Sequence, residues 1–565
     1  MVRAAFWTAC AYLAAVSVCA DGATREKLAP TTESARHNAY RIFNGVHSVA
    51  RLWGTAVHHN GFSFIPGVVP AGTLLYHGSG RPQIPGGREW LAFEVEHAEL
   101  FTKRFLRPDP PPDGEAFGHT STLRKRDQKP LPARPAHSCV DETAEQHQQS
   151  GTGYLHTFQA RRDLNVLILD GMSAAYSCSQ RSGAGGGDLF YLLLRHADGH
   201  PDSNFEEECR KGEQDAIKDP YGYDFLAEHA RKSCKVATKL GFDALLRAEA
   251  GFELIYCDFQ SDGLDLVASV AQISYHKRLT DEMNPLFDWT RAITRKYDGI
   301  GRDRLRIDFS SMVSGLFFPF NYSSPLPDDP DRARLLAAGE ENWQPLYDYA
   351  IGALHGGGGK FIVNWQAVAE SIVDRYSDKL THLASPNISA LIFLEQVEAV
   401  TMTYLSEVRP GANQANTKTD GMLEAIDSCT KMYLLPALAT RKRWTLADEL
   451  LHTATETVVR SVCEDYYRIY SLLLESAPDR AATRPCRERS QDFETKKMQD
   501  AVKASQEIVQ KLVQKLDWSD WRKPRQCAPD EFLYIAMSPF GTDNDYSNPG
   551  CRSAEYMRTL PHGYW

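Results

Sequence analysis

The chain has 565 residues, of which 42% are hydrophobic, and it carries a formal net charge of −10. A chain of this length is expected to form about two domains, each large enough for its own core. The acidic balance argues against general affinity for nucleic acid or anionic lipid, so we expect no nucleic-acid partner.

Residues 1–20 have the pattern of a secretory signal peptide. Arg3 supplies the positive start, residues 4–18 are apolar, and Val18-Cys19-Ala20 matches the small-residue pattern of a cleavage site. The apolar run is short for a transmembrane helix, and we find no later stretch that is long enough. We therefore expect a secreted, extracellular protein without a membrane span; an uncleaved membrane anchor is the alternative.

The cysteines and two sequons fit this compartment. An even number of cysteines, ten, follows the signal peptide, and in an oxidising compartment disulfides are the expected state. They form one group from Cys139 to Cys257 and another from Cys429 to Cys551, but their connectivity cannot be read from the spacing. Asn321 and Asn387 begin Asn-x-Ser sequons and are predicted glycosylation sites.

A helical segment over 21–62 is expected to precede an α/β domain over 63–284. Short apolar runs bounded by turn residues predict the strands of this domain: "TLLYH", "EWLAFEVE", "YLHTFQA", "LNVLILD", "DLFYLLLR", "ALLRAEA" and "FELIYCDF". The segment "YDFLAEHARKSCKVATKLG" predicts a helix that ends at Gly241. Residues 107–150 are rich in proline and aperiodic, which predicts a disordered, exposed loop.

Residues 285–565 are expected to form a helical domain. Thr445 and Asp448 resemble a capping box, and apolar residues from Leu451 to Leu473 then recur at helical spacing. A second such run extends from Met498 to Leu516. The predicted fold class is therefore α+β, with a mixed α/β domain followed by an all-α domain.

Two local patterns suggest known binding or catalytic loops. "HGGGGK", residues 355–360, resembles a phosphate loop, but Leu354 stands where the first glycine is needed, so we expect a flexible connector. "LNVLILDGMSAA" places Ser173 at a strand end, as in a nucleophile elbow. A serine hydrolase would also need residues such as Asp258 and His276. No metal-ligand spacing occurs, so we predict no metal site.

The order of several segments carries a resemblance. "LLYHGSG" is followed by "EWLAFEVEHAELF", then by "YLHTFQARRDLNVLILDGMSA", and then by "LRAEAGFELIYCDF". In this order the chain resembles a family of secreted fungal proteins of unknown function. The resemblance covers roughly residues 60–320 and implies no known activity.

The same segments show a distant similarity to the ADP-ribosyltransferase fold. That family places a His at one strand end, an aromatic residue on a second strand and a Glu on a later strand. The similarity implies that His77 and Trp90 bind NAD, as a substrate rather than a cofactor. It also implies that Glu253 stabilises the transition state as nicotinamide leaves. Phe93 could replace Trp90, and Glu249 could replace Glu253.

Structural interpretations of these residues stand beside the catalytic one. His77 can cap a strand, and Glu253 can be a solvated residue that points out of its strand. The protein would then be a non-catalytic secreted interaction protein or effector, with a host or other extracellular protein as partner. A transferase site requires the side chains of His77, Trp90 and Glu253 to meet in one cleft.

Overall fold

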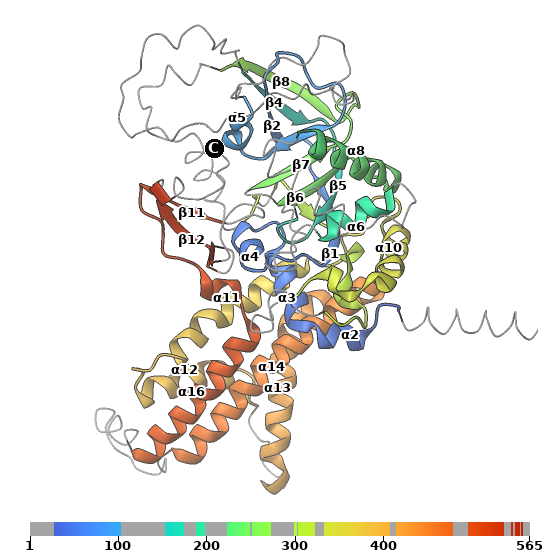
Figure 1. Cartoon of the computed structure of the whole chain (residues 1–565). Helices are drawn as coiled ribbons and strands as arrows, with labels where there is room; N and C mark the ends of the chain where they lie inside the picture. The colour runs from blue at the N-terminus through green and yellow to red at the C-terminus, as the bar shows by residue number, and fades with distance from the viewer. Residues whose placement is uncertain are drawn as a thin grey trace, which may run out of the picture.

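A mixed β-sheet and a layer of long helices make up the part of the chain that the computed structural model describes (Figure 1). The described residues are 28–102, 153–173, 188–197, 223–248, 251–272, 299–301, 303–322, 333–406, 414–477, 495–535, 544–545, 548–553 and 555–556. The expected signal peptide, 1–20, and the expected loop, 107–150, lie outside them and stay predictions.

Short helices precede the sheet, namely α2 (Thr32–His37), α3 (Ala39–Ser48) and α4 (Leu52–Val57). The side chain of Thr31 caps α2 by accepting a hydrogen bond from the N–H of Ser34. The apolar face of α3 buries Ile42, Phe43 and Val46. In Figure 1 these helices lie where the sheet meets the long helices. Helices α2 and α3 contact the long helices, and α4 shares a hydrophobic cluster with the strand residue Ala248, so the start of the described chain contacts both layers.

The main sheet is built mostly from antiparallel pairs. Its strands are β1 (Ser63–Val69), β2 (Leu74–Ser79), β3 (Glu89–Ala92), β4 (Tyr154–Ala160), β5 (Leu164–Leu169), β6 (Ala244–Ala248), β7 (Phe252–Tyr256), β8 (Leu264–Ala271), β9 (Arg306–Ile307) and β10 (Val313–Ser314). The spatial order is β10-β1-β5-β6-β7-β3-β2-β4-β8, and β9 also pairs with β1. Only β5 and β6 pair in parallel among the described strands. Figure 1 shows β2, β4 and β8 at the end of the sheet farthest from the long helices.

Helices α5 (Val95–Leu100), α6 (Asp188–Ala197) and α8 (Tyr223–Leu240) belong to the same region. The prediction of a strand at "DLFYLLLR" was wrong, because this run forms α6. A short apolar run does not distinguish a strand from a buried helix. The prediction of α8 is confirmed: the helix is followed by Gly241, whose φ of +93° ends it.

Helix α10 (Glu340–Leu354) packs against α6 beside the sheet. The helical layer consists of α11 (Trp365–Leu383), α12 (Ala390–Thr401), α13 (Gln414–Leu438), α14 (Leu446–Ser476) and α16 (Lys496–Leu516). The long helix α14 packs against α12, α13, α16 and α3. The predicted capping box is confirmed, because Thr445 and Asp448 exchange both of its hydrogen bonds. Among the described helices, none combines the length and apolarity needed to cross a membrane.

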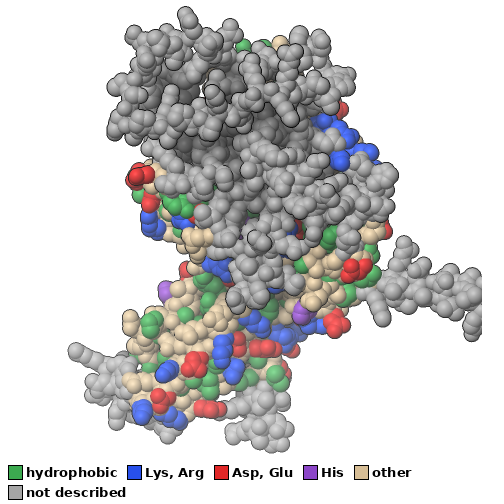
Figure 2. Space-filling model, viewed as in Figure 1, with side chains coloured by type: hydrophobic (Ala, Val, Ile, Leu, Met, Phe, Trp, Pro, Cys, Tyr) green, Lys and Arg blue, Asp and Glu red, His purple; other side chains and the backbone are tan. Residues whose placement is uncertain are grey.

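The expected boundary at 284/285 does not separate strands from helices. Strands β9 and β10 follow it and pair with β1, and β11 (Glu531–Tyr534) pairs with β12 (Gly550–Ser553) near the end of the described chain. One hydrophobic cluster runs from Ala35 to Trp518 and includes residues of both layers. On the face in Figure 2, acidic and basic side chains are interspersed over the long helices. The mixed α+β class is confirmed, with one core shared by sheet and helices.

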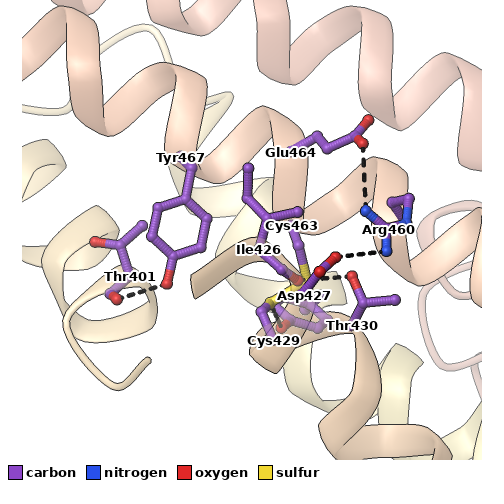
Figure 3. The surroundings of a disulfide bond; sticks show 10 residues. Thr401, Ile426, Asp427, Cys429, Thr430, Arg460, Cys463, Glu464 and Tyr467 are labelled. Carbon is purple, nitrogen blue, oxygen red and sulfur yellow. Dashed lines mark hydrogen bonds and ion pairs between the residues drawn. A yellow bond between two sulfur atoms is a disulfide. The ribbon is translucent and has the colours of Figure 1, made fainter. Parts of the chain in front are cut away.

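Disulfides are present in both layers. The described pairs are Cys234–Cys257, Cys429–Cys463 and Cys527–Cys551. Each pair lies within one of the two groups recognised in the sequence. Figure 3 shows Cys429 of α13 bonded to Cys463 of α14, with Asp427 and Arg460 forming an ion pair at 2.7 Å between the same helices. The disulfide therefore fixes α13 against α14.

Candidate functional site

His77 lies on β2 directly opposite His156 of β4, and both imidazoles are buried. Nδ1 of His77 is 2.8 Å from the carbonyl oxygen of Trp90. Because a carbonyl can only accept, Nδ1 carries the proton and Nε2 keeps its lone pair. Burial and, to a smaller extent, His156 lower the pKa of His77 to about 4, although the bond to Trp90 opposes the shift. His77 is therefore a neutral hydrogen-bond acceptor at neutral pH.

The strand register places His77 and Glu253 on opposite faces of the sheet. Glu253 is paired with Ala92 of β3, and Ala92 is paired with Tyr76 of β2. Paired residues share a face, and consecutive residues of a strand alternate between faces. Tyr76 therefore shares the face of Glu253, whereas the side chain of His77 points to the other face.

Ring contacts support this assignment. The ring of His77 lies 6.0 Å from that of Phe259, which in turn lies 5.2 Å from that of Tyr256. Tyr256 is three positions after Glu253 on β7, so alternation puts it on the opposite face from Glu253. His77, Phe259 and Tyr256 thus form one cluster away from the Glu253 carboxylate.

Glu253 is held in a buried ion pair. Its Oε1 accepts a hydrogen bond from Nε of Arg247 at 2.5 Å, and the two side chains are 3% and 5% exposed. The residues are directly opposite on the β6–β7 hairpin. The sequence suggested either a solvated or a catalytic Glu, but the carboxylate instead neutralises an arginine inside the protein. The clue to this pairing was Arg247, a lone charge within the apolar run "ALLRA".

Trp90 does not complete a site with these residues. It is paired with Ile255, two positions from Glu253, and therefore lies on the face of Glu253. Its contact with His77 is made by its backbone carbonyl, not by its ring. The structure thus brings His77 next to Trp90 but does not bring His77, Trp90 and Glu253 into one cleft. Glu249 lies outside the described residues.

Two titratable groups near His77 were missed in the sequence. Glu89 is paired with Tyr256, and burial raises the pKa of Glu89 to about 7, against the smaller opposing effects of the Trp90 N–H and Arg88. His156 is fully buried, and its Nε2 donates to the carbonyl of Arg81 at 3.2 Å. Its Nδ1 has no hydrogen-bond partner among the described residues. Neither residue stood in a recognisable motif, because their burial depends on strand pairing.

Ser173 is not arranged as a nucleophile. Its hydroxyl is buried and donates to the carbonyl of Leu169 at 2.9 Å. It also accepts a long hydrogen bond of 3.4 Å from the N–H of Ala248. Asp258 lies in an exposed turn, where it accepts from the N–H of Gln260. His276 is outside the described residues, and the hydroxyl contacts of Ser173 within them are with backbone groups.

A small pocket lies at the carboxyl ends of the parallel strands β5 and β6. Asp170, Arg247, Thr55 and Phe252 are among its lining residues, and its interior is about the size of a water molecule. Burial raises the pKa of Asp170 to about 6, although hydrogen bonds from the N–H groups of Phe62 and Gly171 lower it. This pocket holds charged groups but has no room for a nucleotide.

The glycine-rich loop has an internal ligand. The N–H groups of Gly359, Lys360 and Phe361 donate to the carboxylate of Asp308 at 2.8–2.9 Å. Successive N–H groups of this kind form an anion-binding concavity. The loop that failed as a phosphate motif thus binds a carboxylate of the same chain.

The predicted glycosylation sites are exposed. Asn387 lies in the turn between α11 and α12, and Ser389 of its sequon caps α12. Asn321 is exposed in the segment after the short helix Gly315–Phe317. Within the described residues, no three His, Cys, Asp or Glu side chains are grouped as metal ligands.

The fold and these contacts define a disulfide-bonded α+β protein in which Glu253, His77 and Ser173 make internal contacts. Residues 32–284 match the family described as the YPL277C N-terminal domain. The chain is 24% identical to the uncharacterized protein YOR389W of Saccharomyces cerevisiae, over 89% of this chain and 82% of that protein. It is 25% identical to the uncharacterized protein YPL277C of the same yeast, over 55% of this chain and 67% of that protein.

These matches support a fungal family of unknown function. They agree with the fungal part of the resemblance seen in the sequence. No solved structure matches the chain. The ADP-ribosyltransferase likeness therefore has no support from a known fold.

Proposed function

We propose that this protein is secreted and acts by binding another extracellular protein, without catalysis. The signal-peptide pattern of residues 1–20 supports secretion. The disulfides Cys234–Cys257, Cys429–Cys463 and Cys527–Cys551 support an oxidising compartment. The exposed positions of Asn321 and Asn387 are compatible with attached glycans.

The buried Arg247–Glu253 ion pair is the observation that carries the non-catalytic proposal. A carboxylate that stabilises a developing positive charge must face the substrate, whereas Glu253 is 3% exposed and its Oε1 is bonded to Arg247. The side chains of His77 and Ser173 likewise donate hydrogen bonds to backbone carbonyls. Glu253, His77 and Ser173 thus each already have a structural partner.

The activity test uses the secreted, purified full chain. We expect no release of nicotinamide from NAD and no labelling of Ser173 by a fluorophosphonate. NAD turnover that is lost in a folded Glu253→Gln variant would overturn the proposal and restore the transferase. Labelling that disappears in Ser173→Ala would overturn it in favour of a hydrolase.

The localisation test uses the chain expressed with and without residues 1–20. We expect the full chain in the culture medium and the truncated chain inside the cells. We also expect a mass decrease on enzymatic removal of N-linked glycans, reduced in Asn387→Gln. A full chain that stays inside the cells would contradict secretion without bearing on catalysis.

A further inference from the structure

Residues 308–311 connect the sheet to the helical layer. They lie between β9 and β10, which both pair with β1. The N–H of Asp308 donates to the carbonyl of Pro66 at 2.8 Å, which ties the segment to the middle of β1. The side chain of Asp308 is fully buried. A buried carboxylate needs several donors to offset its lost hydration.

The loop before α11 supplies most of these donors. Asp308 accepts from the N–H groups of Gly359, Lys360 and Phe361, at 2.8, 2.9 and 2.9 Å, and from the hydroxyl of Ser311 at 2.7 Å. The glycines from 356 to 359 all have φ between +77° and +95°. Glycine adopts this region without strain, so the run can turn the chain and bring the N–H groups of residues 359–361 to the carboxylate.

Ser310 makes the corresponding contact with the starts of two long helices. Its hydroxyl donates to Oδ1 of Asp448 at 2.9 Å and accepts from the N–H groups of Ile362 and Val363. The same Oδ1 of Asp448 accepts from the indole N–H of Trp365 at 2.9 Å. Trp365 begins α11, and Asp448 lies in the first turn of α14. The starts of both helices are therefore bound at one point.

We propose that residues 308–311 form a clamp that makes the sheet and the helical layer unfold as one cooperative unit. Asp308 is the internal ligand of the anion-binding loop 356–361, and Ser310 joins that loop to α14. The contacts are buried, so removal of either side chain leaves backbone donors without an acceptor. The clamp is independent of whether the protein is catalytic.

The coupling test compares Asp308→Ala and Ser310→Ala with Asp163→Asn. Asp163 is a suitable control because its carboxylate is about half exposed and pairs with Arg306 of β9 at 2.5 Å. Hydrogen exchange is measured for amides of β1 and β5 and for amides of α11 and α14. In the wild type and in Asp163→Asn, the sheet amides and the helix amides are expected to exchange at matching rates.

In the two clamp variants we expect the α11 and α14 amides to exchange at least about tenfold faster than the sheet amides. Calorimetry is expected to resolve two transitions instead of one. A clamp variant that is less stable, but in which the sheet amides and the helix amides still lose their protection from exchange together, would overturn the coupling. If Asp308→Ala does not fold, Ser310→Ala and Asp308→Asn give the same comparison with smaller perturbations.

A chemical rescue tests the anion site directly. Removing the carboxylate in Asp308→Ala leaves a space that a formate ion can fill. Sodium formate is therefore added, and sodium chloride at equal ionic strength is the control. We expect formate to raise the Tm of Asp308→Ala by several degrees and to leave Ser310→Ala at its chloride value. Equal Tm values of folded Asp308→Ala in formate and chloride would overturn the internal-ligand assignment.

Discussion

At the scale of single residues, the buried Arg247–Glu253 ion pair is expected to contribute to the free energy of unfolding. Glu253→Gln removes a buried carboxylate and leaves Arg247 without this counter-charge, and breaking such a pair typically costs about 3–5 kcal/mol. We expect the free energy of unfolding, measured in urea, to fall by that order. The double variant Arg247→Leu/Glu253→Leu should recover much of the loss, because apolar replacements carry no buried charge. Unchanged stability of Glu253→Gln would contradict the structural role.

His77 predicts a pH dependence. Its pKa is about 4 in the folded protein and 6.5 as a model value, so the unfolded state binds more protons between these values. Stability from neutral His77 is therefore present above pH 6.5 and lost as the pH falls toward 4, by up to about 3 kcal/mol. Urea titrations from pH 7 to pH 4 should show this loss, with a shallower slope in His77→Asn.

Other buried groups contribute to the same titration, so the comparison with the variant is needed. His47, whose pKa is lowered to about 3 by burial and by Arg51, adds a slope of the same sign. Glu89 and Asp170 have raised pKa values of about 7 and about 6, so their contribution is favourable at low pH and lost as the pH rises. Identical slopes in the wild type and His77→Asn would refute the assignment to His77.

At the scale of elements, the glycine loop makes a prediction with an internal control. An added Cβ at Gly358 would lie 2.5 Å from Cβ of Pro66, at a φ of +77°. Gly358→Ala should therefore lower the free energy of unfolding by more than about 1 kcal/mol. At Gly352, within α10, an added Cβ meets nothing within 4 Å. Gly352→Ala should be neutral or stabilising by up to about 1 kcal/mol, and equal effects of the two changes on Tm would argue against the loop geometry.

Elements with a strong local signal could be predicted from the sequence. The α14 face from Leu451 to Leu473 is buried as its spacing predicts, and Thr445 caps the helix. Strand β1 was not predicted, because Pro66 and Gly67 disfavour the interior of a strand. Strand β8 was not predicted either. Neither of its faces is buried, so its residues give no clear alternation of apolar and polar positions.

The candidate site was harder to predict than the elements. Residue types suggested His77, Trp90 and Glu253, but their faces follow from the pairing of β7, β3 and β2. A shift of one residue in that register reverses the face of every side chain in a strand. No local pattern encodes such a register between strands far apart in the chain. The opposite orientations of His77 and Glu253 could therefore be learned only from the folded chain.

At the scale of the whole molecule, the buried disulfide should report global unfolding. Cys429 and Cys463 are fully buried between α13 and α14, whereas Cys527 and Cys551 are partly exposed near the end of the described chain. A reductant reaches a buried disulfide only when the surrounding structure opens. Under native conditions with dithiothreitol, we expect alkylation and mass spectrometry to detect Cys527 and Cys551 first, with Cys429 and Cys463 protected. Urea at the unfolding midpoint should remove this difference. Equal alkylation of both pairs in the folded protein would show that α13 opens independently of the shared core.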